Sequence, residues 1–342
     1  MENEPLKILH VDAGREWRGG QQQVAYLLKG LFERGYLQYM LCPVQSGLND
    51  ICREYNIPCY NASLRGEFDI RSIRTIASLS RFFGINILHA HCAHSLALCQ
   101  WSRFFYHKPR LIAARRVDFS VHKRIIGAWK YSNPRVDRII CVSKAIEQIL
   151  LRDGVPPGRL TTVYSGVDLQ KFACSVAVRR AELDIPEHHI LIGTIAALAD
   201  HKDYPNLMHA ARLALDQRRD ITFLALGDGP EKPKLELLAR DLGLGTRFKF
   251  MGHQADVGAF LKGFDLFVLA SKTEGLGTSI LDAQAAGLPV VATRAGGIPE
   301  LIQHRRSGLL VRPRQPSELA EALLKLLDNK PLREKIARQG KK

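Results

Sequence analysis

Short apolar runs alternate with helix-like segments along almost the whole chain, and this alternation restricts the fold more than any other feature. The first run, 6–11, precedes a glycine-rich loop and a segment, 21–34, whose apolar residues keep helical spacing. Further runs occupy 39–43, 86–89, 110–114, 138–142, 190–193, 221–227, 247–250, 266–270 and 290–293. Runs that are apolar throughout are typical of strands buried on both faces, so the pattern predicts parallel sheets covered by helices.

The chain divides into two halves of similar kind. Its 342 residues are more than a single hydrophobic core usually holds. The alternation of apolar runs and helix-like segments becomes irregular only around 166–180 and then restarts. We therefore predict an α/β protein with two doubly wound, Rossmann-like domains, 1–175 and 176–342. Ligands bind beyond the carboxyl ends of the strands in such sheets, so we expect the two sheets to face each other across a cleft.

Charge and composition limit the class of protein. The formal net charge is +15, which favours an anionic partner such as nucleic acid, a phosphorylated substrate or a membrane surface. No run of apolar residues is long enough to span a bilayer, and the acidic first residues are not typical of a signal peptide. Seven scattered cysteines without a Cys-x-x-Cys pair indicate reduced thiols, so we expect a cytoplasmic protein.

The stretch "SKTEGLGTSILDAQAAGLPVVATRAGGIPEL", 271–301, combines an acid, glycines and a helix start. Glu274 follows a predicted strand and precedes Gly275 and Gly277, and Asp282 is the next acid along the chain. A helix start attracts phosphate, and glycines let a ligand approach the backbone. A carboxylate beside it can accept two hydrogen bonds from a sugar diol. We interpret the stretch as a nucleotide-sugar site; alternatively, Glu274 caps the helix and the glycines only form a turn.

Three histidines follow the run at 86–89, in "ILHAHCAHS". His-x-His beside a cysteine is compatible with a metal site, but no carboxylate or fixed fourth ligand accompanies His89, His91 and His94. We predict that no metal binds here and that His89 points the opposite way on the strand, into the core. The sequence also lacks an Asp-x-Asp pair, which favours chemistry without a metal, and we expect no cofactor.

Four blocks in order resemble the retaining glycosyltransferases of family 4, which have the GT-B fold. The 271–301 stretch resembles the Glu-x7-Glu signature of that family. The other three blocks are "CVSKAIEQILLRDGVPPGRLTTVYSGVDLQKF", "IGTIAALADHKDYPNLMHAA" and "ALGDGPEKPKLELLARDLGLGTRFKFMGH". The resemblance covers most of the chain and implies an acceptor-side first domain and a nucleotide-sugar-binding second domain.

The resemblance also implies roles for residues of the second half. Glu274 corresponds to the residue that contacts the donor sugar, and Lys202 to a lysine on the donor diphosphate. Asp282 stands where the family usually has a ribose-binding glutamate, and Ala197 where it commonly has an arginine. The donor base is expected near 252–254. The backbone amides that would hold sugar or pyrophosphate belong to Gly275, Leu276, Gly277 and Thr278.

In the first half, the resemblance assigns two donor contacts. Gly19 and Gly20, in "DAGREWRGGQQQV", match the family's glycine-rich loop near the donor phosphate. His91 matches the active-site histidine beside the donor sugar. With Glu274 and Lys202 it completes the catalytic residues that the resemblance implies.

The segment "RFFYHKPRLIAARRVDFSVHKRIIGAWKY", 103–131, interleaves lysines and arginines with aromatic residues. It could bind nucleic acid, lie on anionic lipid, or be an ordinary solvated basic face over core aromatics. The motif "ARRVDF" also occurs in family members that build lipopolysaccharide core or similar glycans. Arg115, Arg116 and Asp118 are therefore our acceptor-side candidates.

These observations predict a retaining, metal-independent glycosyltransferase. It would move a sugar from a nucleoside-diphosphate donor to a hydroxyl of a lipid-linked or cell-surface glycan, in the cytoplasm or peripherally on the inner face of the membrane. The alternatives are a nucleotide-sugar 2-epimerase and, less favoured, a basic nucleic-acid-binding protein. Family members end with a helix that crosses back onto the first domain; this chain stops at "LREKIARQGKK", so we expect that helix to be missing or truncated.

Overall fold

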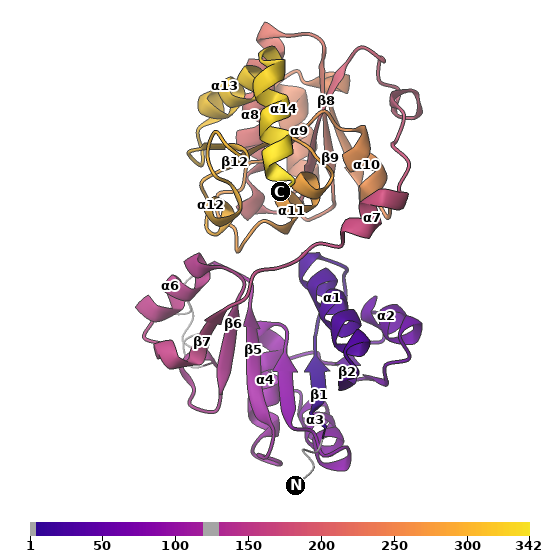
Figure 1. Cartoon of the computed structure of the whole chain (residues 1–342), viewed down its shortest axis with the longest axis vertical. Helices are drawn as coiled ribbons and strands as arrows, with labels where there is room; N and C mark the ends of the chain where they lie inside the picture. Colours follow the sequence, from indigo (N-terminus) through magenta and orange to yellow (C-terminus); the bar gives the residue numbers. More distant parts are fainter. Residues whose placement is uncertain (1–4, 119–129) are drawn as a thin grey trace. The chain divides into compact units, whose positions relative to one another are not determined.

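The chain forms two compact units, Met1–Gly166 and Val167–Lys342, in a computed structural model that describes residues 5–118 and 130–342 (Figure 1). The contacts divide the chain after Gly166, whereas the sequence pattern placed the boundary near residue 175. Each unit has its own parallel sheet, so each is described separately below. Among the described residues, no helix is both long and apolar enough to cross a bilayer.

The described part of the first unit is built on a seven-stranded sheet. Its order is β3-β2-β1-β4-β5-β6-β7, and the neighbouring strands are parallel. The strands are β1 Lys7–Val11, β2 Leu37–Cys42, β3 Cys59–Asn61, β4 Ile87–Ala90, β5 Arg110–Arg115, β6 Arg138–Cys141 and β7 Leu160–Thr162. The helices include α1 Gly19–Glu33, α2 Leu48–Glu54, α3 Ile70–Phe82, α4 Ala93–Ser102 and α6 Lys144–Arg152.

The second unit, which the structure describes throughout, has a six-stranded parallel sheet in the order β10-β9-β8-β11-β12-β13. The strands are β8 Ile190–Ile195, β9 Ile221–Leu226, β10 Phe248–Gly252, β11 Leu266–Leu269, β12 Val290–Thr293 and β13 Leu309–Val311. The α-helices are α7 Leu169–Cys174, α8 Tyr204–Gln217, α9 Lys232–Asp241, α10 Val257–Gly263, α11 Thr278–Ala285, α12 Ile298–Leu301, α13 Pro316–Asp328 and α14 Lys330–Gly340.

The apolar runs are apolar throughout because both faces of these strands are buried. Along β11, Leu266 and Val268 pack into one core cluster, with residues of α8, α9 and α13. Phe267 and Leu269 pack into a second cluster, with residues of α10, α11 and α12. Gly193 in β8 leaves space for a ring: a Cβ built there would lie 1.9 Å from the ring of Phe264.

The predicted fold class is confirmed, and the strand order indicates where a ligand is expected to bind. In each sheet the order reverses between two central strands, β1 and β4 in the first unit and β8 and β11 in the second. The loops that leave the carboxyl ends of such a strand pair diverge to opposite faces of the sheet, and the space they leave is where ligands bind in doubly wound proteins. The short edge strands β3, β7 and β13 were not predicted, because runs of three residues carry too little pattern.

Candidate functional site

In the second unit, Lys202 and Glu274 meet at the point where the strand order reverses. Lys202 ends the short 3-10 helix Asp200–Lys202 after β8, and Glu274 lies in the loop after β11. The Lys202 ammonium forms an ion pair with Oε2 of Glu274, and both side chains are largely shielded from solvent, at 15% and 13% exposure. Ser271 Oγ donates a second hydrogen bond to the same carboxylate, at 3.1 Å. The two predicted catalytic residues of this unit therefore lie together as one charged pair.

The loops that carry this pair are joined by further bonds. The backbone N–H of Lys272 donates to the carbonyl of His201 at 2.9 Å, and the Lys272 ammonium bonds Asp200 at 2.6 Å. On the other side, Thr293 Oγ1 donates to the carbonyl of Ser271 at 2.5 Å. Asp203, directly after Lys202, holds a left-handed backbone with φ of 50°. The pair is thus held from both loops before any ligand arrives.

The helix start beside Glu274 depends on a glycine. Gly277 is the N-cap residue of α11 and has φ of 90°, a conformation that L side chains rarely adopt. A Cβ there would also lie 3.2 Å from Ile280 and 3.3 Å from Ile298. The N-cap residue of α11 is thus Gly277 and not Glu274. By helix geometry, the N–H groups of the first turn of α11 have no intrahelical acceptor and suit an anion.

The remaining predicted donor residues of this unit lie along the same segment. Gly275, Leu276 and Gly277 are buried in the loop, and Thr278 is the first residue of α11. Asp282 lies one turn further along α11 and is partly exposed. The structure therefore gathers the predicted sugar and diphosphate residues at one helix start. The ribose role of Asp282 stays a prediction.

In the first unit, three histidines pack against one another at the ends of β1 and β4. His10 is paired in register with His89, and His10 Nδ1 lies 3.0 Å from Nε2 of His91. The ring centroids of His89 and His91 are 4.1 Å apart. The prediction that His89 points away from His91 was wrong, because side chains two residues apart on a strand share one face. His10 belongs to this cluster although the sequence did not single it out.

Burial keeps these histidines uncharged. It lowers the pKa of His10 to about 3. The pKa of His89 and of His91 is also well below the ordinary value, first because of burial and then because of neighbouring histidines and the Arg116 guanidinium. Neutral His91 can still donate or accept a hydrogen bond, and its Nδ1 is buried without a hydrogen-bond partner.

The same cluster is the one group of metal-ligating side chains found among the described residues. One ring nitrogen from each of His10, His89 and His91 lies within 4.8 Å of the other two. Neutral imidazole is a common metal ligand, so the residue types fit a transition metal. However, the neighbouring Arg116 charge that lowers the pKa of His89 and His91 also disfavours a cation between them.

The three acceptor-side candidates, Arg115, Arg116 and Asp118, have different surroundings in the structure. Arg116 donates from Nη1 to the carbonyl of His91 at 2.7 Å, and its Cδ would lie 3.9 Å from a Cβ built at Gly20 in the first turn of α1. Arg115 is buried and stacks on the Tyr131 ring, with its guanidinium carbon 4.7 Å from the centroid. Asp118 is partly exposed, and residues 119–129 of the basic segment lie outside the described residues. Arg116 is thus grouped with His91 and Gly20, whereas Arg115 packs internally.

Asp12 organises the glycine-rich loop of the first unit and was missed by the sequence analysis. Its carboxylate accepts a bond from the backbone N–H of Gly14 at 2.6 Å and from Nε2 of Gln21 at 3.1 Å. The exposed Gly19 begins α1 just before Gln21. Asp12 is almost fully buried, and an acid directly after an apolar run was the available signal. It ties the loop to the start of the helix that carries Gly19 and Gly20.

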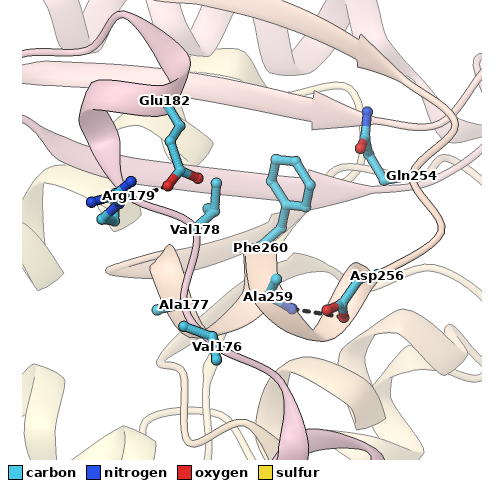
Figure 2. A pocket seen from close by; sticks show the side chains of 9 residues that line it. All are labelled: Val176, Ala177, Val178, Arg179, Glu182, Gln254, Asp256, Ala259 and Phe260. Atoms are coloured by element: carbon cyan, nitrogen blue, oxygen red, sulfur yellow. Dashed lines mark hydrogen bonds and ion pairs between the residues drawn. The ribbon is translucent and has the colours of Figure 1, made fainter.

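The second unit also contains a hollow of about 610 Å³ that neither Lys202 nor Glu274 lines; its lining side chains are labelled in Figure 2. One wall comes from residues 176–182, where Arg179 and Glu182 are bonded at 2.6 Å. The opposite wall includes Phe260 and Gln254, the latter in the segment predicted to lie near the donor base. None of the predicted catalytic residues lines it.

Comparison with known families matches most of the chain. The model for "Glycosyltransferase Family 4" matches residues 17–171, and the model for "Glycosyl transferases group 1" matches residues 176–342. The two matches meet close to the predicted domain boundary.

Two relatives come from Rhizobium meliloti and are lipopolysaccharide core biosynthesis glycosyltransferases. LpsD is 32% identical over 328 residues, which cover 96% of this chain and 81% of LpsD. LpsE is 35% identical over 166 residues, which cover 48% of this chain and 47% of LpsE. Among solved structures, Anabaena Alr3699/HepE in complex with UDP-glucose superimposes with a TM-score of 0.86. It is 20% identical and covers 98% of this chain and 93% of its own, which supports the two-sheet fold.

Proposed function

Because this chain belongs to the group 1 glycosyltransferases, we propose that it transfers a sugar from a nucleoside-diphosphate donor to a glycan hydroxyl with retention of configuration. The observation that carries the proposal is the Lys202–Glu274 pair beside the glycine-bounded start of α11. A cation, a helix start and a carboxylate at one point suit a diphosphate that is bonded to a sugar.

In this proposal each group at the helix start acts on a different part of the donor. Lys202 and the amides of residues 275–278 stabilise the negative charge that develops on the diphosphate as the glycosidic bond breaks. Glu274 accepts hydrogen bonds from the sugar hydroxyls, and Asp282 binds the ribose. In the first unit, neutral His91 has a hydrogen-bonding role toward the sugar, as in the family it resembles. The acceptor hydroxyl attacks from the face that the diphosphate leaves, so no enzyme nucleophile is required.

Calorimetric titration with UDP, GDP and ADP tests this proposal. We expect the native chain to bind one of the three with a Kd in the micromolar range. Lys202→Ala should weaken that binding at least roughly tenfold, since a shielded charge-assisted bond to phosphate is lost. Lys234→Ala, which changes an exposed lysine on α9, is the control and should bind as the native chain does. Absence of binding to all three diphosphates would contradict the proposed donor.

We also propose that the reaction needs no metal. The Lys202 ammonium and the start of α11 supply positive charge where a divalent cation would otherwise neutralise the diphosphate. Transfer measured after dialysis against EDTA should therefore equal transfer measured with added Mg²⁺ or Mn²⁺. Loss of activity in EDTA that Zn²⁺ restores would instead point to the histidine cluster as a metal site.

For the acceptor we propose a lipid-linked or cell-surface glycan such as lipopolysaccharide core, and a place of action in the cytoplasm at the inner face of the membrane. The relatives LpsD and LpsE support this class of acceptor by their names. The basic and aromatic residues of 103–131 support contact with anionic lipid. A 2-epimerase would convert the nucleotide sugar without any acceptor, so product analysis without acceptor separates the two activities.

A further inference from the structure

One surface of the first unit combines exposed phenylalanines with exposed cations, and we call it the α3 face. Part of it is the outer side of α3, and part is the loop 103–109 that follows α4. These two segments are separated in sequence by the whole of β4 and α4. The α3 face consists of Ile70, Arg71, Arg74, Arg81, Phe82, Phe104, Phe105 and Lys108, all exposed.

Direct contacts join the two segments into one surface. Helices α3 and α4 pack against each other. The Arg81 guanidinium donates to the carbonyl of Phe105 at 3.1 Å and lies 5.5 Å from the ring centroid of Tyr106. The end of α3 and the loop after α4 therefore present their side chains side by side.

The aromatic rings of this face are unusually open to solvent. Phe82 is 81% exposed, Phe104 58% and Phe105 51%. Phe104 stacks on Trp101 with ring centroids 5.6 Å apart, and the Arg135 guanidinium carbon lies 4.2 Å from its centroid. Large apolar side chains exposed together on a surface are typical of a site that contacts a membrane or another molecule.

Positive charge surrounds these rings without local compensation from the same stretch of chain. No aspartate or glutamate occurs from Ile70 to Val117, which contains eight lysines and arginines. The flanking Asp69 accepts bonds from Ser63 at 2.6 Å and Ser72 at 2.7 Å, so its carboxylate is engaged at the start of α3. Asp137 pairs with Arg103 at 2.9 Å and with Arg110 at 3.7 Å, neither of which belongs to the α3 face.

The phenylalanines of the α3 face lie away from the ligand-binding edge of the sheet. Phe82 ends α3, just before β4 begins, and the loop 103–109 leads directly into β5. The end of α3 and the loop 103–109 therefore lie at the amino ends of the strands that follow them, whereas Ile70 and Arg71 begin α3, after the carboxyl end of β3. His91 and Arg116 follow the carboxyl ends of β4 and β5, so they lie at the opposite edge.

We propose that the α3 face docks the enzyme on the surface of an anionic phospholipid bilayer. The phenylalanines and Ile70 enter the headgroup region, and Arg71, Arg74 and Lys108 meet the lipid phosphates. Exposed aliphatic and aromatic side chains along a helix suit lipid, whereas single-stranded nucleic acid is bound in a groove with stacked rings. The inference deepens the proposed membrane contact and rests on the proposed function for its lipid-linked acceptor, but docking does not require sugar transfer.

The test is cosedimentation of the full chain with vesicles of phosphatidylcholine alone or mixed with phosphatidylglycerol. We expect binding to the anionic vesicles that weakens with added salt, and little binding to phosphatidylcholine alone. The variant Arg71→Gln/Arg74→Gln/Phe82→Ser should partition at least roughly twentyfold less, since each cation near an anionic surface contributes about fivefold. A second variant, Phe105→Ser/Lys108→Gln, should bind less by at least roughly fivefold for the same reason.

Matched changes on α9 in the second unit provide the control. Lys234→Gln/Arg240→Gln/Leu237→Ser removes two exposed cations and one exposed apolar side chain, and should leave vesicle binding unchanged. An equal loss in this control, or equal binding to both kinds of vesicle, would overturn the proposal. So would a preference for single-stranded RNA that the α3-face variants abolish while vesicle binding persists.

Titration of the same proteins with UDP, GDP and ADP separates this inference from the proposed function. If the native chain binds a diphosphate but no vesicles, docking fails and the donor site stands. If it binds anionic vesicles through the α3 face but no diphosphate, the proposed function fails and docking stands.

Discussion

Glu274→Gln is expected to bind the nucleoside diphosphate more tightly than the native enzyme and yet to transfer sugar at least roughly a hundredfold more slowly. In the ligand-free structure, the Lys202 ammonium is already paired with the Glu274 carboxylate, and both are largely shielded from solvent. An incoming diphosphate must therefore share or displace this carboxylate. The neutral amide removes one negative charge from beside the phosphates, which we expect to tighten binding about tenfold, or ~1.4 kcal/mol.

The loss of transfer has a separate cause. In the proposed mechanism the Glu274 carboxylate accepts hydrogen bonds from the donor sugar, and an amide offers one acceptor oxygen and a donor in its place. Calorimetry with the diphosphate and a transfer assay, run on the same preparation, measure the two effects. Glu318→Gln changes a partly exposed glutamate that is paired with Arg312 and should alter neither. Weaker binding of the diphosphate by Glu274→Gln would show that Glu274 serves mainly to position Lys202.

The first unit is expected to lose stability steeply on mild acidification. His10 is fully buried and neutral in the folded state, with a pKa of about 3, against an ordinary value of 6.5. A histidine with a lowered pKa binds more protons when the chain unfolds, so its contribution to stability falls as the pH drops from about 6.5 toward 3. At about pH 5 this amounts to about 2 kcal/mol for each histidine that stays neutral on folding. His89 and His91 shift in the same direction and should add to the effect.

Urea unfolding followed by tryptophan fluorescence measures this dependence. Trp17, Trp101 and Trp129 are the three tryptophans of the chain and all belong to the first unit, so the signal reports that unit alone. His10→Gln should reduce the slope of stability against pH by about 1.4 kcal/mol per unit between about pH 5 and 6, although it also destabilises the fold. The exposed His253, in the second unit, gives a control in His253→Gln, which should leave the slope unchanged. An unchanged slope in His10→Gln would contradict the assignment.

The local pattern of residues determined the fold class and part of the site. Apolar runs predicted the central strands because both faces of those strands are buried, as the alternation of Leu266 to Leu269 between two clusters shows. Glu274 and Lys202 could be singled out because each follows such a run and belongs to a block that resembles a known family. The glycine at 277 could also be singled out from the sequence, because glycine is the residue that most readily adopts the positive φ found there.

Only the tertiary structure decided which of these segments meet. Strand order brings β8 beside β11 and β1 beside β4, so Lys202 pairs with Glu274 and His10 joins His89 and His91. The same packing places the end of α3 against the loop after α4. Periodicity along a chain records which face of each element is buried, but not which element lies next to it. Contacts between residues distant in sequence depend on how all the helices and strands pack their apolar faces against one another. That arrangement is defined only in the folded chain.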